Sequence, residues 1–189
     1  LWLVLVACAT TTGGVLSAYS YISPLLTDRA GIATDLVPLV LVGFGVGSLI
    51  GTVLGGRLGD VRPLATAIVV PAVTTVVLLA VYLLSAHPGP TVVLVVLLGL
   101  FGLSANPVLS SLAVRLGGVA ATLGVAMSVS AYNLGTAVGS GIAGATLSSG
   151  LGATGPAVVG TGIAALTLIP TITIARIQRR RPAAHPPAS

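Results

Sequence analysis

The sequence is poor in charge. Among its 189 residues are eight arginines, three aspartates and no lysine or glutamate, so charged residues make up 6% of the chain, against about 25% in ordinary soluble proteins. Hydrophobic residues make up 55%, and the mean hydropathy is +1.12. A soluble domain of this size needs a largely polar surface, and a disordered chain needs low hydrophobicity. The composition therefore excludes both classes and indicates an integral membrane protein.

Cysteine and histidine are also scarce. The single Cys8 excludes a disulfide framework. The two histidines, His87 and His185, lie far from each other and from Cys8, so we expect no metal site and no cofactor. An intramembrane serine protease needs a histidine inside the membrane, and neither histidine lies in a hydrophobic stretch. We therefore expect that the protein is not an enzyme.

Six hydrophobic stretches are long enough to cross a bilayer as helices, which takes roughly 20 apolar residues. They cover residues 1–26, 36–56, 64–85, 91–114, 119–147 and 156–175. The predicted fold class is all-α, with six transmembrane helices in one bundle over residues 1–175. Residues 176–189 form a basic tail rich in proline and alanine, which we expect to be disordered. Because the first stretch begins at Leu1 without a methionine or a charged leader, we also expect further sequence upstream.

The arginines are placed unevenly along the chain. Seven of them follow the second, fourth or sixth stretch, and only Arg29 lies on the other side. This is the positive-inside pattern of membrane proteins, so it predicts that both ends of the chain are cytoplasmic. It also explains the net charge of +5 without a nucleic-acid partner. Arginine without lysine, beside abundant alanine, glycine and valine, is typical of a GC-rich genome, so we expect a bacterial cell membrane.

The hydrophobic stretches hold little that is polar. All charged residues fall in turns, helix ends or the tail. Since an ionisable residue inside a membrane usually marks an ion pathway, the chain lacks a carboxylate proton relay of its own. The only two asparagines, Asn106 and Asn133, do lie inside stretches. An unpaired amide facing lipid is costly, so we expect both to face protein or a wet cavity, and Pro107 to kink the helix beside Asn106.

Small residues repeat every four positions in two stretches. The second stretch carries Gly43, Gly47, Gly51, Gly55 and Gly59, and the fifth carries Ala131, Gly135, Gly139 and Ala143. Such spacing lets helix backbones approach closely, so we interpret Gly43, Gly47, Gly51, Gly55, Gly135 and Gly139 as helix-packing residues. These stretches are the middle ones of two triplets. That arrangement is typical of two three-helix inverted repeats.

The densest charged motif follows the second stretch, in the sequence from Gly55 to Pro63. It contains Gly56, Arg57, Asp60 and Arg62. One interpretation is an anchor at the membrane surface in which Asp60 caps the next helix. The other is a cytoplasmic gating loop that locks one conformational state.

These motifs resemble those of a known family. The Gly56-x-x-x-Asp60 turn is similar to the signature loop of major facilitator superfamily transporters. The run from Tyr19 to Leu26, followed by Gly31, resembles the seventh span of the drug-efflux branch that includes chloramphenicol-resistance and arabinose-efflux permeases. The run from Ser130 to Gly135, continuing to Gly139 and Gly144, resembles its eleventh span.

The resemblance implies the second six-helix half of a twelve-helix, proton-coupled efflux transporter, an antiporter that can confer antibiotic resistance. Its partners would be the lipid bilayer, a small-molecule substrate and a missing N-terminal half or a second copy. By the family's arrangement, the cavity candidates are Tyr21, Phe44, Asn106, Met127 and Asn133. Two alternatives remain: a truncated, non-transporting remnant, and a self-dimerising half-transporter. An aquaporin-type channel is disfavoured, because it needs two Asn-Pro half-helices and this sequence has one.

Overall fold

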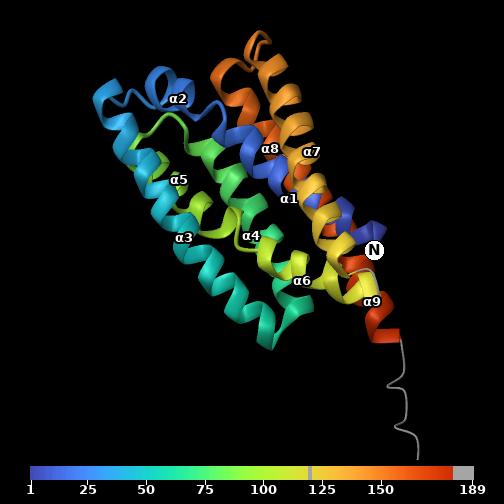
Figure 1. The fold of residues 1–189 in the computed structure, drawn as a ribbon. Helices are drawn as coiled ribbons and strands as arrows, with labels where there is room; N and C mark the ends of the chain where they lie inside the picture. The colour runs from blue at the N-terminus through green and yellow to red at the C-terminus, as the bar shows by residue number, and fades with distance from the viewer. Residues whose placement is uncertain (119–120, 181–189) are drawn as a thin grey trace, which may run out of the picture.

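The computed structural model describes residues 1–118 and 121–180, and within them the chain is helical without strands (Figure 1). The predicted all-α class is therefore confirmed. The first triplet contains α1 (Trp2–Tyr19), the short α2 (Ile22–Pro24), α3 (Val37–Val61) and α4 (Pro63–Leu84). The second contains α5 (Pro88–Gly102), α6 (Asn106–Gly117), α7 (Ala121–Leu147), α8 (Gly155–Leu166) and α9 (Leu168–Arg180).

Five segments of the described chain are long and apolar enough to cross a membrane. They are Trp2–Tyr19, Thr34–Val61, Pro63–Leu84, Pro88–Gly117 and Gly152–Arg179. The remaining predicted span is α7, which has 27 residues and is thus about 40 Å long. It is less apolar because it carries Ser128, Ser130, Tyr132, Asn133, Thr136 and Ser140. In Figure 1 it runs beside α1 along the bundle, as a sixth span would.

Three of the predicted helices are interrupted. The first ends as α1 at Tyr19 and continues as α2 and a π-helical turn, Leu25–Arg29. The fourth is divided into α5 and α6 and the sixth into α8 and α9. Each break lies a few residues before a proline, namely Pro24, Pro107 and Pro170, because proline lacks the N–H that would bond to the carbonyl oxygen four residues earlier. Pro71, by contrast, lies inside an unbroken α4.

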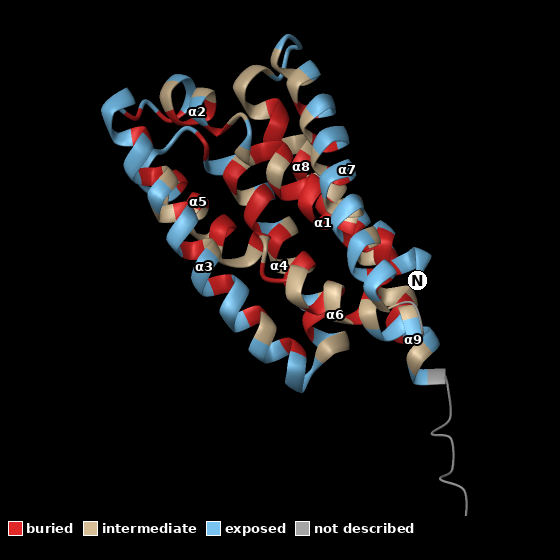
Figure 2. Cartoon of the chain, in the orientation of Figure 1, coloured by how far each residue is buried: buried red, intermediate tan, exposed pale blue. Residues whose placement is uncertain are grey.

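The helices of the two triplets contact each other reciprocally. The middle helix of each triplet packs on the first helix of the other: α3 on α5, and α7 on α1. The last helices, α4 and α8, pack on each other. Exchanging the two triplets leaves this pattern unchanged, as expected of repeats related by a pseudo-twofold axis in the membrane plane. Figure 2 shows the buried residues on the facing sides of these helices.

The expected gating loop is mostly helix, and this corrects the sequence analysis. Gly56, Arg57 and Asp60 lie within α3, which ends only at Val61. Only Arg62 separates α3 from α4; its backbone, at φ −138° and ψ 66°, is not helical, as expected because the following Pro63 disfavours the α conformation at the residue before it. Arg62 rather than Asp60 occupies the N-cap position of α4, and its side chain makes no capping hydrogen bond. Asp60 is exposed and does not cap the helix as one interpretation proposed.

The C-terminal helix also extends further than the expected bundle boundary at residue 175. Helix α9 continues to Arg180, so residues 176–180 of the expected tail belong to this helix. Residues 181–189, which include Arg181 and His185, lie outside the described residues, as do 119 and 120 at the expected start of the fifth helix.

Candidate functional site

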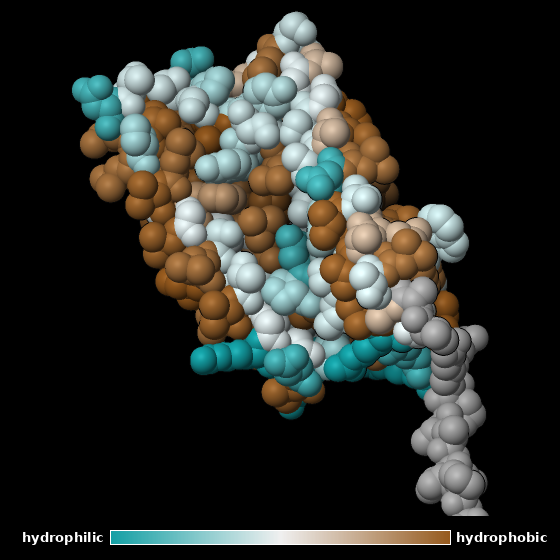
Figure 3. Space-filling model, in the orientation of Figure 1, coloured by the Kyte–Doolittle hydropathy of each residue, from teal (hydrophilic) through white to brown (hydrophobic). Residues whose placement is uncertain are grey.

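One face of the bundle is more polar than its flanks. Figure 3 shows a pale and teal strip running between the brown surfaces of α3 and α7. Helix α7 contributes exposed Ser130 and Asn133 and half-buried Thr136 and Ser140. Their spacing of three or four residues places them on one side of the helix. We call these four side chains the polar face of α7.

The polar face of α7 is joined to α1 at one point. Ser140 Oγ lies 3.1 Å from the Oγ of exposed Ser20, just after the end of α1. The apolar residues Leu134, Val138 and Ile142 are also exposed, but they occupy another side of α7. Helix α7 therefore presents two different surfaces, one polar and one apolar.

Asn106 lies where α5 and α6 are broken apart. It is half-buried as the first residue of α6. Its carbonyl oxygen accepts a hydrogen bond of 2.9 Å from the Tyr132 hydroxyl of α7. Its side-chain oxygen, Oδ1, is buried without a hydrogen-bond partner among the described residues. A buried unsatisfied amide oxygen is costly, so Asn106 Oδ1 is a candidate acceptor for a ligand or water.

Tyr132 is a residue that the sequence analysis did not single out. Besides its bond to Asn106, its hydroxyl lies 3.1 Å from Ser110 Oγ of α6. Its own carbonyl oxygen accepts a 3.0 Å hydrogen bond from Thr12 Oγ1 of α1. Tyr132 thus links α1, α6 and α7 beside the helix break. The one signal for Tyr132 in the sequence is its position directly before Asn133, within the run from Ser130 to Gly135 that resembles the eleventh span of the drug-efflux branch.

The five predicted cavity residues do not share one surface. Asn133 lies on the polar face of α7, and Asn106 lies at the nearby break. Tyr21 is half-buried between α1 and α2, with its hydroxyl facing Gly144 of α7. Met127 is seven residues from Leu134, so it lies on the apolar side of α7. Phe44 is 5% exposed and stacks on Tyr19, with ring centroids 4.1 Å apart, so it packs α3 against α1.

The glycines of α3 and α7 lie where helix backbones approach most closely. A Cβ atom added at Gly51, Gly135 or Gly139 would collide with a carbonyl oxygen of the neighbouring helix, that of Leu100, Ala9 or Gly13 respectively. At Gly55 it would collide with the carbonyl oxygen of Ser104, in the break between α5 and α6. At Gly47 it would come within 2.6 Å of the Val96 oxygen, whereas at Gly43 it would meet only the Val96 side chain. The backbone contacts at Gly47, Gly51 and Gly55 of α3 and at Gly135 and Gly139 of α7 thus leave no room for any side chain.

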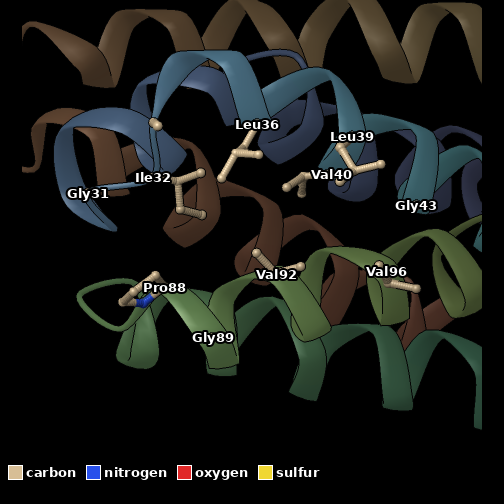
Figure 4. A pocket seen from close by; sticks show the side chains of 11 residues that line it. Gly31, Ile32, Leu36, Leu39, Val40, Gly43, Pro88, Gly89, Val92 and Val96 are labelled. Carbon is tan, nitrogen blue, oxygen red and sulfur yellow. The ribbon is translucent and has the colours of Figure 1, made fainter.

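An apolar pocket of about 410 Å³ lies between α3 and α5 (Figure 4). Its walls include Ile32, Leu36, Val40, Val92 and Val96. Its size is within the range of small-molecule sites. It contains none of the five predicted cavity residues. Nothing in the sequence indicated this pocket, because its two walls, from residues 31–43 and 88–96, are far apart in the chain and contribute only glycine, proline and aliphatic residues.

Charge is confined to the two ends of the bundle. Arg57, Arg62, Arg115, Arg176 and Arg179 are all exposed and belong to the ends of α3, α6 and α9, which lie at one end of the molecule (Figure 1). We call this the basic end. Asp28, Arg29 and Asp35 lie in the α1–α3 connection at the opposite end. Within the described helices, no charged side chain lies midway between the ends.

The chain is similar to several bacterial transport proteins. It is 32% identical, over 93% of its length, to "Inner membrane transport protein YdhP" of Escherichia coli K12. It is 27% identical to "Uncharacterized MFS-type transporter YtbD" of Bacillus subtilis 168 over 76% of its length, and 27% identical to "Chloramphenicol resistance protein" of Streptomyces lividans over 78%.

These alignments cover only part of each relative: 46%, 37% and 38% of their respective lengths. The chain thus spans about half the length of the relatives it matches, or less. No family model matches the chain, and no solved structure matches it significantly.

Proposed function

Because this chain belongs to the major facilitator superfamily, we propose that it is the second six-helix half of a transporter that exports a small amphiphilic compound or drug in exchange for protons. The observation that carries this proposal is the match of 93% of the chain to 46% of a transport protein. A drug as substrate is supported by the similarity to a chloramphenicol resistance protein. Transport, rather than catalysis, also suits a bundle whose described spans carry no charged group midway along them.

In this proposal the other half of the transporter faces the polar strip between α3 and α7. The substrate then lies between the halves, against the polar face of α7 and near Asn106 Oδ1. These groups are uncharged donors and acceptors beside large apolar surfaces, a combination that suits an amphiphile. The proton-carrying carboxylates belong to the other half, because no acidic residue lies midway along a described span here.

Alternating access in such a transporter is a rocking of one half against the other. The close backbone contacts at Gly51, Gly55, Gly135 and Gly139 tie α3 to α5 and α7 to α1. We therefore propose that this half moves as one rigid body. Gly56, Arg57, Asp60 and Arg62 lie at the basic end, where they would contact the other half when the cavity is closed on that side.

An efflux assay tests the proposal. The protein is expressed from its natural coding sequence in a drug-sensitive bacterium, and the cellular accumulation of labelled chloramphenicol is measured. We expect accumulation to fall severalfold and a protonophore to restore it. Asp60→Asn is expected to weaken efflux while leaving the amount of protein in the membrane unchanged.

Two results would contradict this proposal. Accumulation that stays unchanged over a panel of amphiphilic drugs would favour the non-transporting remnant. Full efflux by the 189-residue chain alone would favour a self-dimerising half-transporter over one half of a longer protein.

The asymmetry of the arginines supports an orientation with the basic end in the cytoplasm of a bacterial inner membrane. Both termini would then be cytoplasmic. His87→Cys, in the exposed α4–α5 connection, tests this in a Cys8→Ser background. We expect a membrane-impermeant maleimide to label the introduced thiol from the outside of intact cells. Labelling only after the membrane is opened would reverse the orientation.

A further inference from the structure

At the basic end, an apolar groove of about 200 Å³ opens between α1, α6 and α9. Its walls are formed by Leu1, directly before α1, by Leu3 and Val4 of α1, by Leu116 of α6, and by Ile174, Ile177 and Gln178 of α9. Leu3, Leu116 and Ile177 are 38%, 40% and 46% exposed. The side chains of Leu1 and of three helices thus form an apolar groove at the basic end. We call this space the basic-end groove.

Three arginines are direct sequence neighbours of residues that line this groove. Arg115 directly precedes Leu116, Arg176 directly precedes Ile177, and Arg179 follows Gln178, another residue of the groove wall. All three arginines are exposed. Among the side chains that the structure describes, the basic end carries five exposed arginines and one acid, Asp60. An anion placed at the mouth of the groove would therefore meet several positive charges and little repulsion.

We propose that the basic-end groove binds an anionic phospholipid, with an acyl chain along the apolar walls and the phosphate headgroup near Arg115, Arg176 and Arg179. The combination of an apolar slot with arginines at its outer edge matches a molecule that is apolar at one end and negative at the other. Basic pockets between transmembrane helices bind such headgroups in this way. The site lies apart from the polar face of α7 and does not depend on what the protein transports.

The test uses protein expressed from its natural coding sequence and purified in a neutral detergent. Native mass spectrometry measures the binding of phosphatidylglycerol and of phosphatidylcholine with the same acyl chains. We expect tighter binding of phosphatidylglycerol, weakened by salt. Arg115→Gln with Arg176→Gln should weaken it about 25-fold, at about fivefold for each arginine near the membrane surface. The control pair Arg57→Gln with Arg62→Gln removes the same charge from another part of the basic end and should change the affinity less than about twofold.

A second pair of variants tests the apolar part of the site and decides the outcome if the arginine variants do not fold. Ile177→Trp fills the groove and should weaken the binding of phosphatidylglycerol severalfold. Ile169→Trp, at a position that is 64% exposed on the same helix and is not part of the groove, should leave it unchanged. Equal binding of both lipids, equal loss in the control pair, or full binding by Ile177→Trp would each overturn the proposal. The last result would also arise if another part of the protein occupies the groove.

Discussion

Replacing Gly51 by alanine is expected to destabilise the protein by about 1–3 kcal/mol, the usual cost of forcing an extra carbon into a packed interior. A Cβ atom at Gly51 would overlap the carbonyl oxygen of Leu100 in α5. Because this obstacle is backbone, it cannot rotate away, and α3 must move from α5. The free energy of unfolding in detergent, followed by circular dichroism during chemical denaturation, measures the effect.

Gly45 is the matched control for Gly51. It lies in the same helix, and a Cβ atom there would meet nothing within 4 Å. Gly45→Ala should leave the free energy of unfolding unchanged or raise it by up to about 1 kcal/mol, because alanine is the better helix former. The same substitution is thus expected to lower the free energy of unfolding at Gly51 but not at Gly45, six residues away. A similar shift in both variants would contradict the close contact between α3 and α5.

The second repeat offers an independent copy of this experiment. In α7, a Cβ atom at Gly135 would overlap the Ala9 carbonyl oxygen of α1, whereas Gly141 has open space. Gly135→Ala should therefore destabilise the protein and Gly141→Ala should not. Agreement between the two helices would support the pseudo-twofold arrangement, since the two contacts are counterparts within the repeats.

The sequence predicted the spans well, for a physical reason. Backbone groups inside a bilayer must bond within their own helix, so hydropathy alone marks each segment. The predicted helix at 64–85 lies within one residue at each end of α4, Pro63–Leu84. The predicted helix at 36–56 begins one residue before α3, but α3 continues to Val61. Charged residues suggested a turn there, yet a helix that has left the membrane core still tolerates Arg57 and Asp60.

The candidate site was less predictable, because it depends on which side of each helix faces which neighbour. Phe44 and Met127 were cavity candidates because the family's arrangement places their helices around the cavity, and the structure places one in the packed interior and the other on the apolar side of α7. Tyr132 was not singled out, because its partners Thr12 and Asn106 lie 120 and 26 residues away in the chain. The small-residue spacing, by contrast, could point to the closest helix contacts, since that pattern is local.

The two surfaces of α7 have different expected environments in the membrane. Asn133 belongs to the polar face, which we propose to line the transport cavity. Val138 is 52% exposed on the apolar side, which we expect to contact lipid. The two positions are five residues apart on one helix. They therefore lie at a similar depth in the membrane and in the same backbone conformation, but their side chains face different surroundings.

Cysteine accessibility compares these surroundings most directly. Asn133→Cys and Val138→Cys are made separately in a Cys8→Ser background, in protein expressed from its natural coding sequence in membranes. A membrane-impermeant thiol reagent should modify the Asn133→Cys protein about tenfold faster than the Val138→Cys protein or more, because the reacting thiolate needs water around it. The reaction of the Asn133→Cys protein should also slow when a transported drug is present. Equal rates in the two variants, or faster reaction of Val138→Cys, would contradict a water-filled substrate cavity along the polar face of α7.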